Sequence, residues 1–436
     1  MLYSNPFIEK LKAWPSDKIL LVENNSPITA GELWNHSISM AHKLLSKGIK
    51  KGDRVVMVLK PGSDFLKLMY ANMLVRSVIT IIDPEMGRDN YKAKFKQFNP
   101  QHAFVDSRLI LLNEHPILRY ILGKIKPSLP FFPRTKHCSI FTIGKRLPIF
   151  QKHIYLSFQG LKPFYNEIHN ADSNEDDFLV TYTSGTLAEP KGVVHTIKSL
   201  DQTMSLLTDL LDKGSNENIA THLPHFMLLG ISAGRRVYMW DNEISAQEKL
   251  QFIEEKKIST IFGPPSDFVP MMQYLTKSPA FFPSNLKNIY FGSAPVHAAF
   301  LSKFAKVCSQ VKLTCLYGMT ENLMVCVKDG HEKATYQGKG DILGKPFAGV
   351  QLTIENDGEI GVYSNQKFKR YWHEETSSDV HLSGDLGEID SDGNLILIGR
   401  KKDMIISGGE NVYPREVEEF LYTHQAVRDV QVFGIP

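Results

Sequence analysis

The chain has 436 residues, which exceeds one ordinary domain and allows a large buried core. Hydrophobic residues make up 42% and charged residues 22%, as in a soluble globular protein, and the net charge of +3 favours no particular partner. No apolar run approaches the roughly 18 residues of a membrane span, and charges at Glu9, Lys10 and Lys12 exclude a signal-peptide core. The four cysteines lack zinc-like spacing, so we expect reduced thiols in a cytoplasmic protein.

The first third of the chain predicts alternating helices and strands. A helical pattern begins near Thr29 and ends at Gly48, and residues 55–59 read as a buried strand. A helix over 65–74 and a strand over 78–82 follow. The alternation predicts an α/β fold with mostly parallel sheets. The same pattern recurs at residues 251–258, 261–262, 298–307 and 313–316.

From about Gly344 the pattern changes to short β-like segments separated by Gly and Asp turns. These segments predict a small antiparallel barrel. They are residues 350–355, 361–364, 387–389 and 395–399.

Residues 108–163 are basic, with ten Lys or Arg against one acid, Glu114, and with interleaved Phe and Tyr. One interpretation is a solvated basic loop with its own small core. Another is an interfacial patch that draws the protein to anionic lipid as a peripheral contact. Nucleic-acid binding is the weakest interpretation, because no recognition module accompanies the stretch, so we expect no nucleic-acid partner.

A polar loop, Thr183–Gly192, directly follows the apolar run 178–180. Its backbone N–H groups and hydroxyls can meet phosphate oxygens, and Lys191 adds a cation. Taken alone, the loop could equally be a polar turn between two strands.

Three later stretches reduce the weight of that alternative: Tyr317–Glu321, Ser383–Glu388 and Gly399–Glu418. With the loop, in this order, they resemble the acyl-adenylating superfamily of acyl-CoA synthetases, adenylation domains and luciferases. The resemblance runs from about residue 17 to the end. It implies a large domain over 1–399, with two mostly parallel α/β sheet subdomains and a β-barrel at about 340–399. A hinge at 400–402 and the start of a truncated small α+β carboxyl-terminal domain at 403–436 would follow.

In this family the polar loop clamps the β- and γ-phosphates of ATP. The resemblance assigns this role to Thr183, Ser184, Gly185, Thr186 and Lys191. The family usually has Thr-Gly where this chain has Leu187-Ala188. The exchange removes one hydroxyl and some backbone freedom, which weakens the expected hold on pyrophosphate.

The second stretch implies contacts to the nucleotide. Tyr317 would stack on adenine, Thr320 would contact the α-phosphate, and Glu321 would hold Mg²⁺, a hard cation that prefers carboxylate. Gly318 and Met319 belong to the same nucleotide site, and Gly318 also to the acyl pocket. A helix-capping Thr-Glu is the plain alternative.

The third and fourth stretches complete this site. Asp385 would accept hydrogen bonds from the ribose hydroxyls, and Arg400 would touch the ribose or the phosphate. The resemblance also implies that Lys402 is a hinge for rotation of the small domain. The lysine that the family uses near the end of that domain has no counterpart before Pro436, so we expect weak adenylation and weaker thioester formation.

Two further stretches resemble parts of the family's acyl site. The turn Gly292, Ser293, Ala294 and Pro295 would lie beside the carboxylate and adenine, although a plain strand-end turn fits equally. Phe226 and Met227 would line the acyl pocket, with Phe226 as its gate, or else belong to the core.

Together these features predict an AMP-forming acid–thiol ligase that uses ATP, Mg²⁺ and CoA on a carboxylic acid. The apolar, basic-flanked insertion favours a medium- or long-chain fatty acid. Transfer to a carrier protein and closure of a β-lactone stay open. So does a catalytically degenerate nucleotide- or acyl-binding protein.

Overall fold

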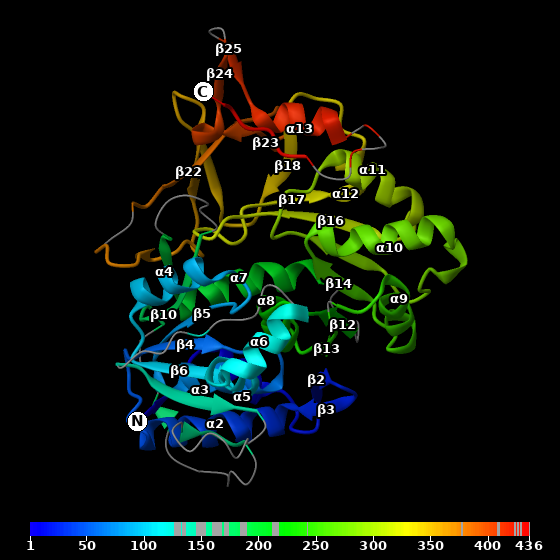
Figure 1. Ribbon diagram of the computed structural model, residues 1–436. Coiled ribbons are helices and arrows are strands. Elements are labelled where there is room, and N and C mark those ends of the chain that lie inside the picture. The colour runs from blue at the N-terminus through cyan, green and yellow to red at the C-terminus, as the bar shows by residue number, and fades with distance from the viewer. Residues whose placement is uncertain are drawn as a thin grey trace. The chain divides into compact units, whose positions relative to one another are not determined.

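The computed structural model describes residues 1–125, 132, 137–144, 154–158, 168–169, 174–183, 190–211, 218–241, 243–375, 378–407, 410–422, 424, 427 and 430–435. The chain forms two compact units, which Figure 1 shows together. Unit 1 comprises residues 1–201 and 368–377, and unit 2 comprises 202–367 and 378–436. The domain boundaries expected from the sequence stay predictions.

Unit 1 contains a mixed sheet in the order β21-β11-β10-β5-β4-β6-β7-β8, in which the strands from β10 to β8 are parallel to one another. The other two strands run antiparallel to their neighbours, β11 to β10 and β21 to β11. Its elements are β1 (Leu2–Tyr3), α1 (Pro6–Ala13), β2 (Ile19–Glu23), β3 (Ser26–Thr29), α2 (Ala30–Ser46), β4 (Arg54–Val58), α3 (Ser63–Val75), β5 (Val78–Ile81), α4 (Arg88–Phe98), β6 (His102–Asp106), α5 (Ser107–Glu114), α6 (Pro116–Ile125), β7 (Ser139–Ile143), β8 (Ile154–Tyr155), β9 (Ile168–His169), β10 (Asp177–Tyr182), β11 (Gly192–Thr196) and β21 (Arg370–Tyr371), with α7 (Ile197–Leu210) spanning the unit boundary.

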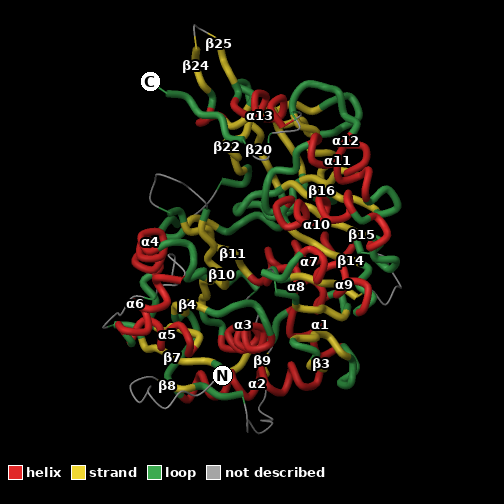
Figure 2. The backbone as a smooth tube through the Cα atoms, turned by 45° about the vertical axis from the view of Figure 1, so that its right-hand side comes forward, coloured by secondary structure: helices red, strands yellow, loops and turns green. Residues whose placement is uncertain are grey.

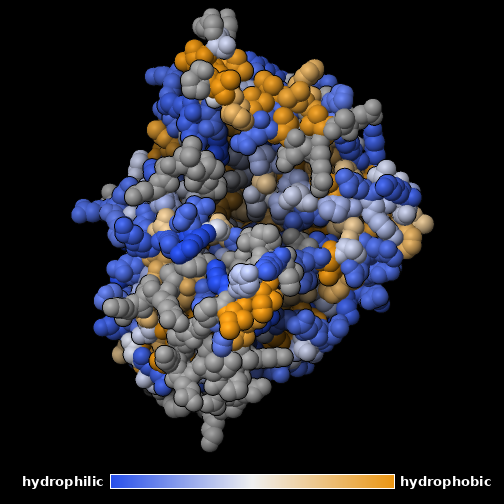
Figure 3. Space-filling model, viewed as in Figure 1, coloured by the Kyte–Doolittle hydropathy of each residue, from blue (hydrophilic) through white to orange (hydrophobic). Residues whose placement is uncertain are grey.

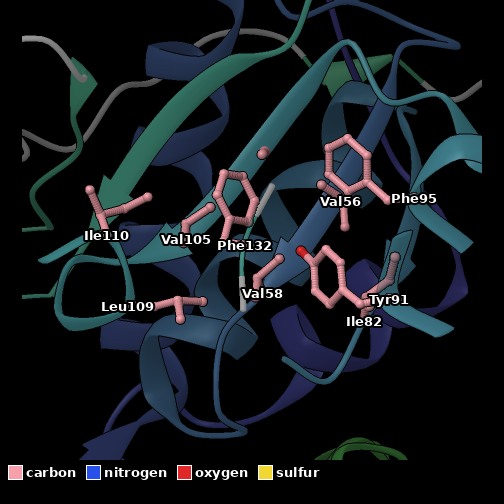
Figure 4. Close-up of a cluster of buried hydrophobic side chains, with 10 residues drawn as sticks. Val56, Val58, Ile82, Tyr91, Phe95, Val105, Leu109, Ile110 and Phe132 are labelled. Atoms are coloured by element: carbon pink, nitrogen blue, oxygen red, sulfur yellow. The ribbon is translucent and has the colours of Figure 1, made fainter. Parts of the chain in front are cut away.

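Local sequence accounts for several of these elements. Thr29 caps α2 by accepting the Glu32 N–H, and the Glu32 side chain accepts the Thr29 N–H in return, which completes a capping box. Helix α3 is buried on nearly all sides, as a helix rich in Leu, Met and Phe can be. Figure 4 shows a core cluster between sheet and helices, where the rings of Tyr91, Phe95 and Phe132 pack against Val56 and Val105.

Unit 2 contains a sheet region in the order β19-β20-β22-β23-β18-β17-β16-β15-β14-β12-β13. The strands from β16 to β13 are parallel, and those from β17 to β19 are antiparallel to their neighbours. Its elements are β12 (Asn218–Thr221), α8 (Pro224–Ser232), β13 (Arg236–Met239), α9 (Ala246–Glu255), β14 (Thr260–Gly263), α10 (Pro265–Lys277), η1 (Pro279–Phe281), β15 (Asn288–Phe291), α11 (Ala298–Val307), β16 (Lys312–Tyr317), β17 (Cys326–Asp329), α12 (Gly330–Ala334), β18 (Asp341–Pro346), β19 (Gln351–Ile354), β20 (Glu359–Tyr363), β22 (His381–Ile389), β23 (Leu395–Arg400), η2 (Lys401–Asp403), β24 (Ile405–Ser407), β25 (Glu410–Val412) and α13 (Pro414–Tyr422).

The expected α/β class is therefore confirmed, but both large sheets are mixed: their parallel strands run from β10 to β8 in unit 1 and from β16 to β13 in unit 2. The short antiparallel strands expected at about 340–399 are present as β18 to β20, β22 and β23. Within unit 2, the last elements, β24, β25 and α13, lie together at one end (Figure 2).

A buried charge cluster ties α13 to the sheet of unit 2. Asp341, at the start of β18, is 2.5 Å from the Lys333 ammonium and also pairs with Arg415 of α13. Lys333 donates a further hydrogen bond to the Ile342 carbonyl at 3.0 Å. Removing one member of such a cluster leaves the others as uncompensated buried charges, which is costly.

Replacing Asp341 with Asn should lower the free energy of unfolding by about 3–5 kcal/mol, because Lys333 and Arg415 lose their shared carboxylate. Chemical denaturation followed by circular dichroism measures this loss. Glu175→Gln, which breaks an exposed pair with Lys198, is the control and should cost at most about 1 kcal/mol. Equal midpoints for the two variants would contradict the assignment.

Candidate active site

The parallel strands of unit 2 end at one edge of their sheet. Their order is β13-β12-β14-β15-β16, so the residues that follow these strands are brought to the same edge. These residues are Trp240, His222, Pro264, Gly292 and Gly318. Ligands of open α/β sheets bind outside the carboxyl ends of the strands, so this edge is the candidate site.

A carboxylate with two partners marks this edge. The Tyr317 hydroxyl donates to Asp385 Oδ2 at 2.7 Å, and Arg400 Nε lies 3.2 Å from Asp385 Oδ1. Asp385 and Arg400 are direct partners in the register of β22 and β23. Asp385 is only 6% exposed, whereas the Arg400 side chain is 59% exposed. Three residues predicted separately from the sequence therefore meet in one place.

The phenol of Tyr317 is held in its protonated form. Burial raises its pKa well above the ordinary value, and the neighbouring Asp385 carboxylate raises it further. A protonated phenol remains a hydrogen-bond donor, so the bond to Asp385 persists over the physiological pH range.

The turn after Tyr317 is tightly built. Met319 N–H donates to the Asn322 carbonyl at 2.8 Å, and Asn322 N–H donates back at 3.1 Å. A Cβ on Gly318 would lie 2.0 Å from the Leu323 carbonyl oxygen, so only glycine fits there. Partly buried Thr320 and Glu321 sit within this turn, which limits their movement.

Glu321 lies near the imidazole of His381. Burial lowers the pKa of His381, and the Glu321 carboxylate acts in the opposite direction. His381 is therefore neutral near pH 7. Among the described residues, no three His, Cys, Asp or Glu side chains cluster as a metal site.

The turn Gly292–Pro295 adjoins an aromatic stack. A Cβ on Gly292 would meet the Phe262 ring at 3.1 Å, and Phe262 stacks on Phe226 with ring centroids 3.3 Å apart. Ser293 has a positive φ of 64°, and Ala294 follows it as an exposed residue. Phe226, which is one ring of this stack, and Met227 are both buried in α8, so their predicted place in an acyl pocket remains a prediction.

A second polar group at this edge was not identified from the sequence. Trp240 Nε1–H donates to His222 Nδ1 at 3.3 Å, and His222 Nε2 lies 3.6 Å from Asp267 Oδ2. Asp267 is the acid that faces His222, whereas Asp241, which directly follows Trp240, is exposed. Only the adjacency of β12 and β14 brings Asp267 here, and no local motif signals that.

The polar loop connects β10 to β11 in unit 1. Its described ends are joined by a hydrogen bond from Thr183 N–H to the Lys191 carbonyl at 3.3 Å. The exposed Lys191 ammonium lies 5.3 Å from the centroid of the Tyr371 ring. Ser184, Gly185 and Thr186 lie outside the described residues, so their predicted phosphate contacts remain predictions.

The predicted hinge, Lys402, lies in the short helical turn η2 directly after β23. Its neighbour Lys401 is fixed: the ammonium lies 2.6 Å from Asp357 Oδ2 and 2.8 Å from Glu359 Oε2. The hinge role itself is untested.

The AMP-binding enzyme family matches residues 7–372. A 2-succinylbenzoate–CoA ligase of Oceanobacillus iheyensis is 26% identical over 97% of this chain and 84% of its own length. A long-chain-fatty-acid–CoA ligase of Bacillus subtilis is 26% identical over 96% of this chain and 80% of its own length. The solved o-succinylbenzoate CoA synthetase of Bacillus subtilis, in complex with ATP and magnesium ion, has a TM-score of 0.77 at 20% identity, covering 100% of this chain and 87% of that chain.

The pKa of His225 gives a pH test of the packing at this edge. Burial and, to a smaller extent, the nearby His222 lower this pKa to about 4. The unfolded chain binds a proton at this residue near pH 6.5, and the folded chain does so only near pH 4. The free energy of unfolding should therefore fall, by up to about 1.4 kcal/mol per pH unit, as the pH drops from 6.5 toward 4.

His225→Gln should reduce that slope, because glutamine does not titrate. Urea unfolding of both proteins at several pH values between 7 and 4.5 measures the difference. Parallel pH dependences for the two proteins would show that the pKa of His225 is not lowered in the folded protein.

Proposed function

The chain belongs to the AMP-binding enzyme family, and from this premise we propose that it joins a carboxylic acid to AMP and then passes the acyl group to coenzyme A. The family match and the CoA ligases among its relatives confirm the expected class, an AMP-forming acid–thiol ligase. The roles of individual residues and the identity of the acid are the proposal. The observation that carries it is the buried Asp385 carboxylate between Tyr317 and Arg400.

These residues fit a nucleotide. A carboxylate offers about four acceptor positions, and Tyr317 and Arg400 occupy one each, which leaves capacity for both hydroxyls of a ribose. The exposed Arg400 guanidinium keeps further N–H donors for a phosphate. Asp385 would therefore bind the ribose, and Tyr317 would border the base.

Glu321 fits a magnesium ion bound together with the nucleotide. Mg²⁺ is usually held by one or two carboxylates plus phosphate oxygens, with water completing the shell. The described part of the chain holds no cluster of three His, Cys, Asp or Glu side chains that could bind a metal. This agrees with a magnesium ion for which the phosphate oxygens of the nucleotide supply part of the ligands. Bound there, the ion would neutralise charge on the leaving pyrophosphate.

The proposed reaction has two displacements. A carboxylate oxygen of the acid attacks the α-phosphorus, and the bond to pyrophosphate breaks; the sulfur of CoA, as thiolate, then attacks the acyl carbon and AMP leaves. Thr320 would hold the α-phosphate, and Lys191 would offset charge on the outer phosphates. Positioning and charge neutralisation supply most of the rate in such reactions.

We propose a medium- or long-chain fatty acid as the substrate. A relative named for long-chain fatty acids and the apolar stack of Phe226 and Phe262 support this choice. A relative named for 2-succinylbenzoate makes an aromatic acid the alternative to test.

The test is acid-dependent exchange of labelled pyrophosphate into ATP, with acids from acetate to palmitate and with aromatic acids. Exchange should be greatest with a medium- or long-chain fatty acid. Glu321→Gln should lower it at least about a hundredfold, because the metal loses its protein ligand. Exchange with aromatic acids alone would overturn the fatty acid, and unchanged exchange in the variant would remove Glu321 from the metal site.

We also propose that α6 touches anionic lipid. Ile117 and Ile121 on this helix are 76% and 51% exposed. Figure 3 shows an apolar patch in the region where Figure 1 places α6. Lys124 and Arg119 lie on the same helix, so an apolar surface is joined to positive charge. Among the described residues, no helix is long and apolar enough to span a bilayer.

Ile121→Glu should weaken binding to phosphatidylserine-containing vesicles about tenfold, because it places an acid in the contact. Vesicle sedimentation measures the effect. Ile406→Glu, on an exposed residue of β24, is the control and should bind like the parent protein. Equal binding of both variants would remove α6 from the contact.

A further inference from the structure

Glu359, the first residue of β20, connects the two strands that carry Asp385 and Arg400. Its Oε1 accepts the Gly384 N–H at 2.9 Å, immediately before Asp385 on β22. Its Oε2 lies 2.8 Å from the Lys401 ammonium, immediately after Arg400 at the end of β23. The Glu359 carboxylate thus contacts Gly384, the neighbour of Asp385, and Lys401, the neighbour of Arg400.

The surrounding register favours this arrangement. Glu359 pairs with Leu386 across β20 and β22, and Asp385 pairs with Arg400 across β22 and β23. Gly384 has a positive φ of 75°, a conformation that residues with side chains rarely adopt. The hydrogen bond from its N–H to Glu359 therefore restrains the backbone at a residue that is otherwise conformationally free.

Glu359 is also the buried member of its charge group. It is 8% exposed, whereas the side chains of Lys401 and Asp357 are about half exposed. The Lys401 ammonium donates hydrogen bonds to the Asp357 and Glu359 carboxylates; these bonds raise the pKa of Lys401, so the ammonium remains charged. A buried carboxylate is retained where both its oxygens are satisfied, and here they are.

We propose that Glu359 is a positioning residue for nucleotide binding: through Gly384 and Lys401 it holds the Asp385–Arg400 pair in the geometry that receives the ribose. The inference rests on the proposed function, because it takes Asp385 and Arg400 as the nucleotide-binding pair. The proposal assigns a role in the nucleotide site to a residue of a third strand, β20. Glu359 also connects this site to Lys401, which precedes the predicted hinge residue Lys402. Arg400 would thus stay fixed while residues after Lys402 move.

The test compares AMP binding by Glu359→Gln, Glu359→Ala and Asp357→Asn, measured by calorimetry. A glutamine amide can satisfy only one of the two contacts, because its NH₂ end faces either a donor N–H or an ammonium. We expect the AMP dissociation constant to rise about tenfold in Glu359→Gln and more in Glu359→Ala. Asp357→Asn, which touches Lys401 but not Gly384, should change it by no more than about twofold.

A second measurement separates positioning from stability. Hydrogen exchange at the Gly384 amide should accelerate in Glu359→Ala without AMP, while the unfolding midpoint shows that the variant is folded. In Glu359→Gln, the KM for ATP should rise more than kcat falls, and adding Lys401→Met should restore part of the affinity by removing the facing ammonium.

The outcomes distinguish the two levels of the argument. If the parent protein binds AMP with the same dissociation constant as folded Glu359→Gln and Glu359→Ala, that result overturns the positioning role of Glu359 and leaves the proposed function standing. No AMP binding by the parent protein overturns the proposed function, and this inference with it.

Discussion

The buried Asp385 carboxylate is the interaction on which the candidate site depends. A charge at this depth is tolerated because Tyr317 donates a hydrogen bond to one oxygen and Arg400 pairs with the other. These contacts fix the direction of its remaining acceptor positions. A carboxylate held in one orientation can bind two neighbouring hydroxyls, whereas a freely rotating carboxylate on the surface cannot do so selectively.

Sheet topology explains how these residues meet. Tyr317 ends the parallel strand β16, and β17, β18 and β23 continue the sheet in antiparallel fashion until β22 brings Asp385 to the tyrosine, 68 residues further along the chain. The rigid turn at Gly318 then holds Thr320 and Glu321 next to the same edge. Ribose, phosphate and metal contacts would therefore be set by backbone that has little freedom to adjust.

Local patterns in the sequence predicted much of the framework. The helical pattern from near Thr29 to Gly48 and the buried run at 55–59 correctly placed α2 and β4, and the segment expected at 298–307 is the helix α11. Such elements are encoded by neighbouring residues, through side-chain periodicity and caps. The motif residues Tyr317, Asp385 and Arg400 were selected by resemblance, and their contact is a result of the structure.

Residues that act through distant contacts were not predicted. Glu359 lies 25 residues before Gly384 and 42 before Lys401, and nothing in that spacing says that its two oxygens reach both. Asp267 reaches His222 only because their strands are adjacent, and the Lys333–Asp341–Arg415 cluster forms across three elements. Phe226 and Met227 match a motif for the acyl pocket, but both are buried, and Phe226 stacks on Phe262, a residue that the motif does not contain.

The central claim is that Asp385 binds the two hydroxyls of the ribose, and one binding measurement tests this claim directly. The dissociation constants of AMP and 2′,3′-dideoxy-AMP are compared for the parent protein and for Asp385→Asn. The account predicts that the parent protein binds AMP at least about tenfold more tightly than the dideoxy analogue and that the variant binds the two almost equally. Equal preference for AMP in both proteins would show that another group recognises the ribose and would contradict the account.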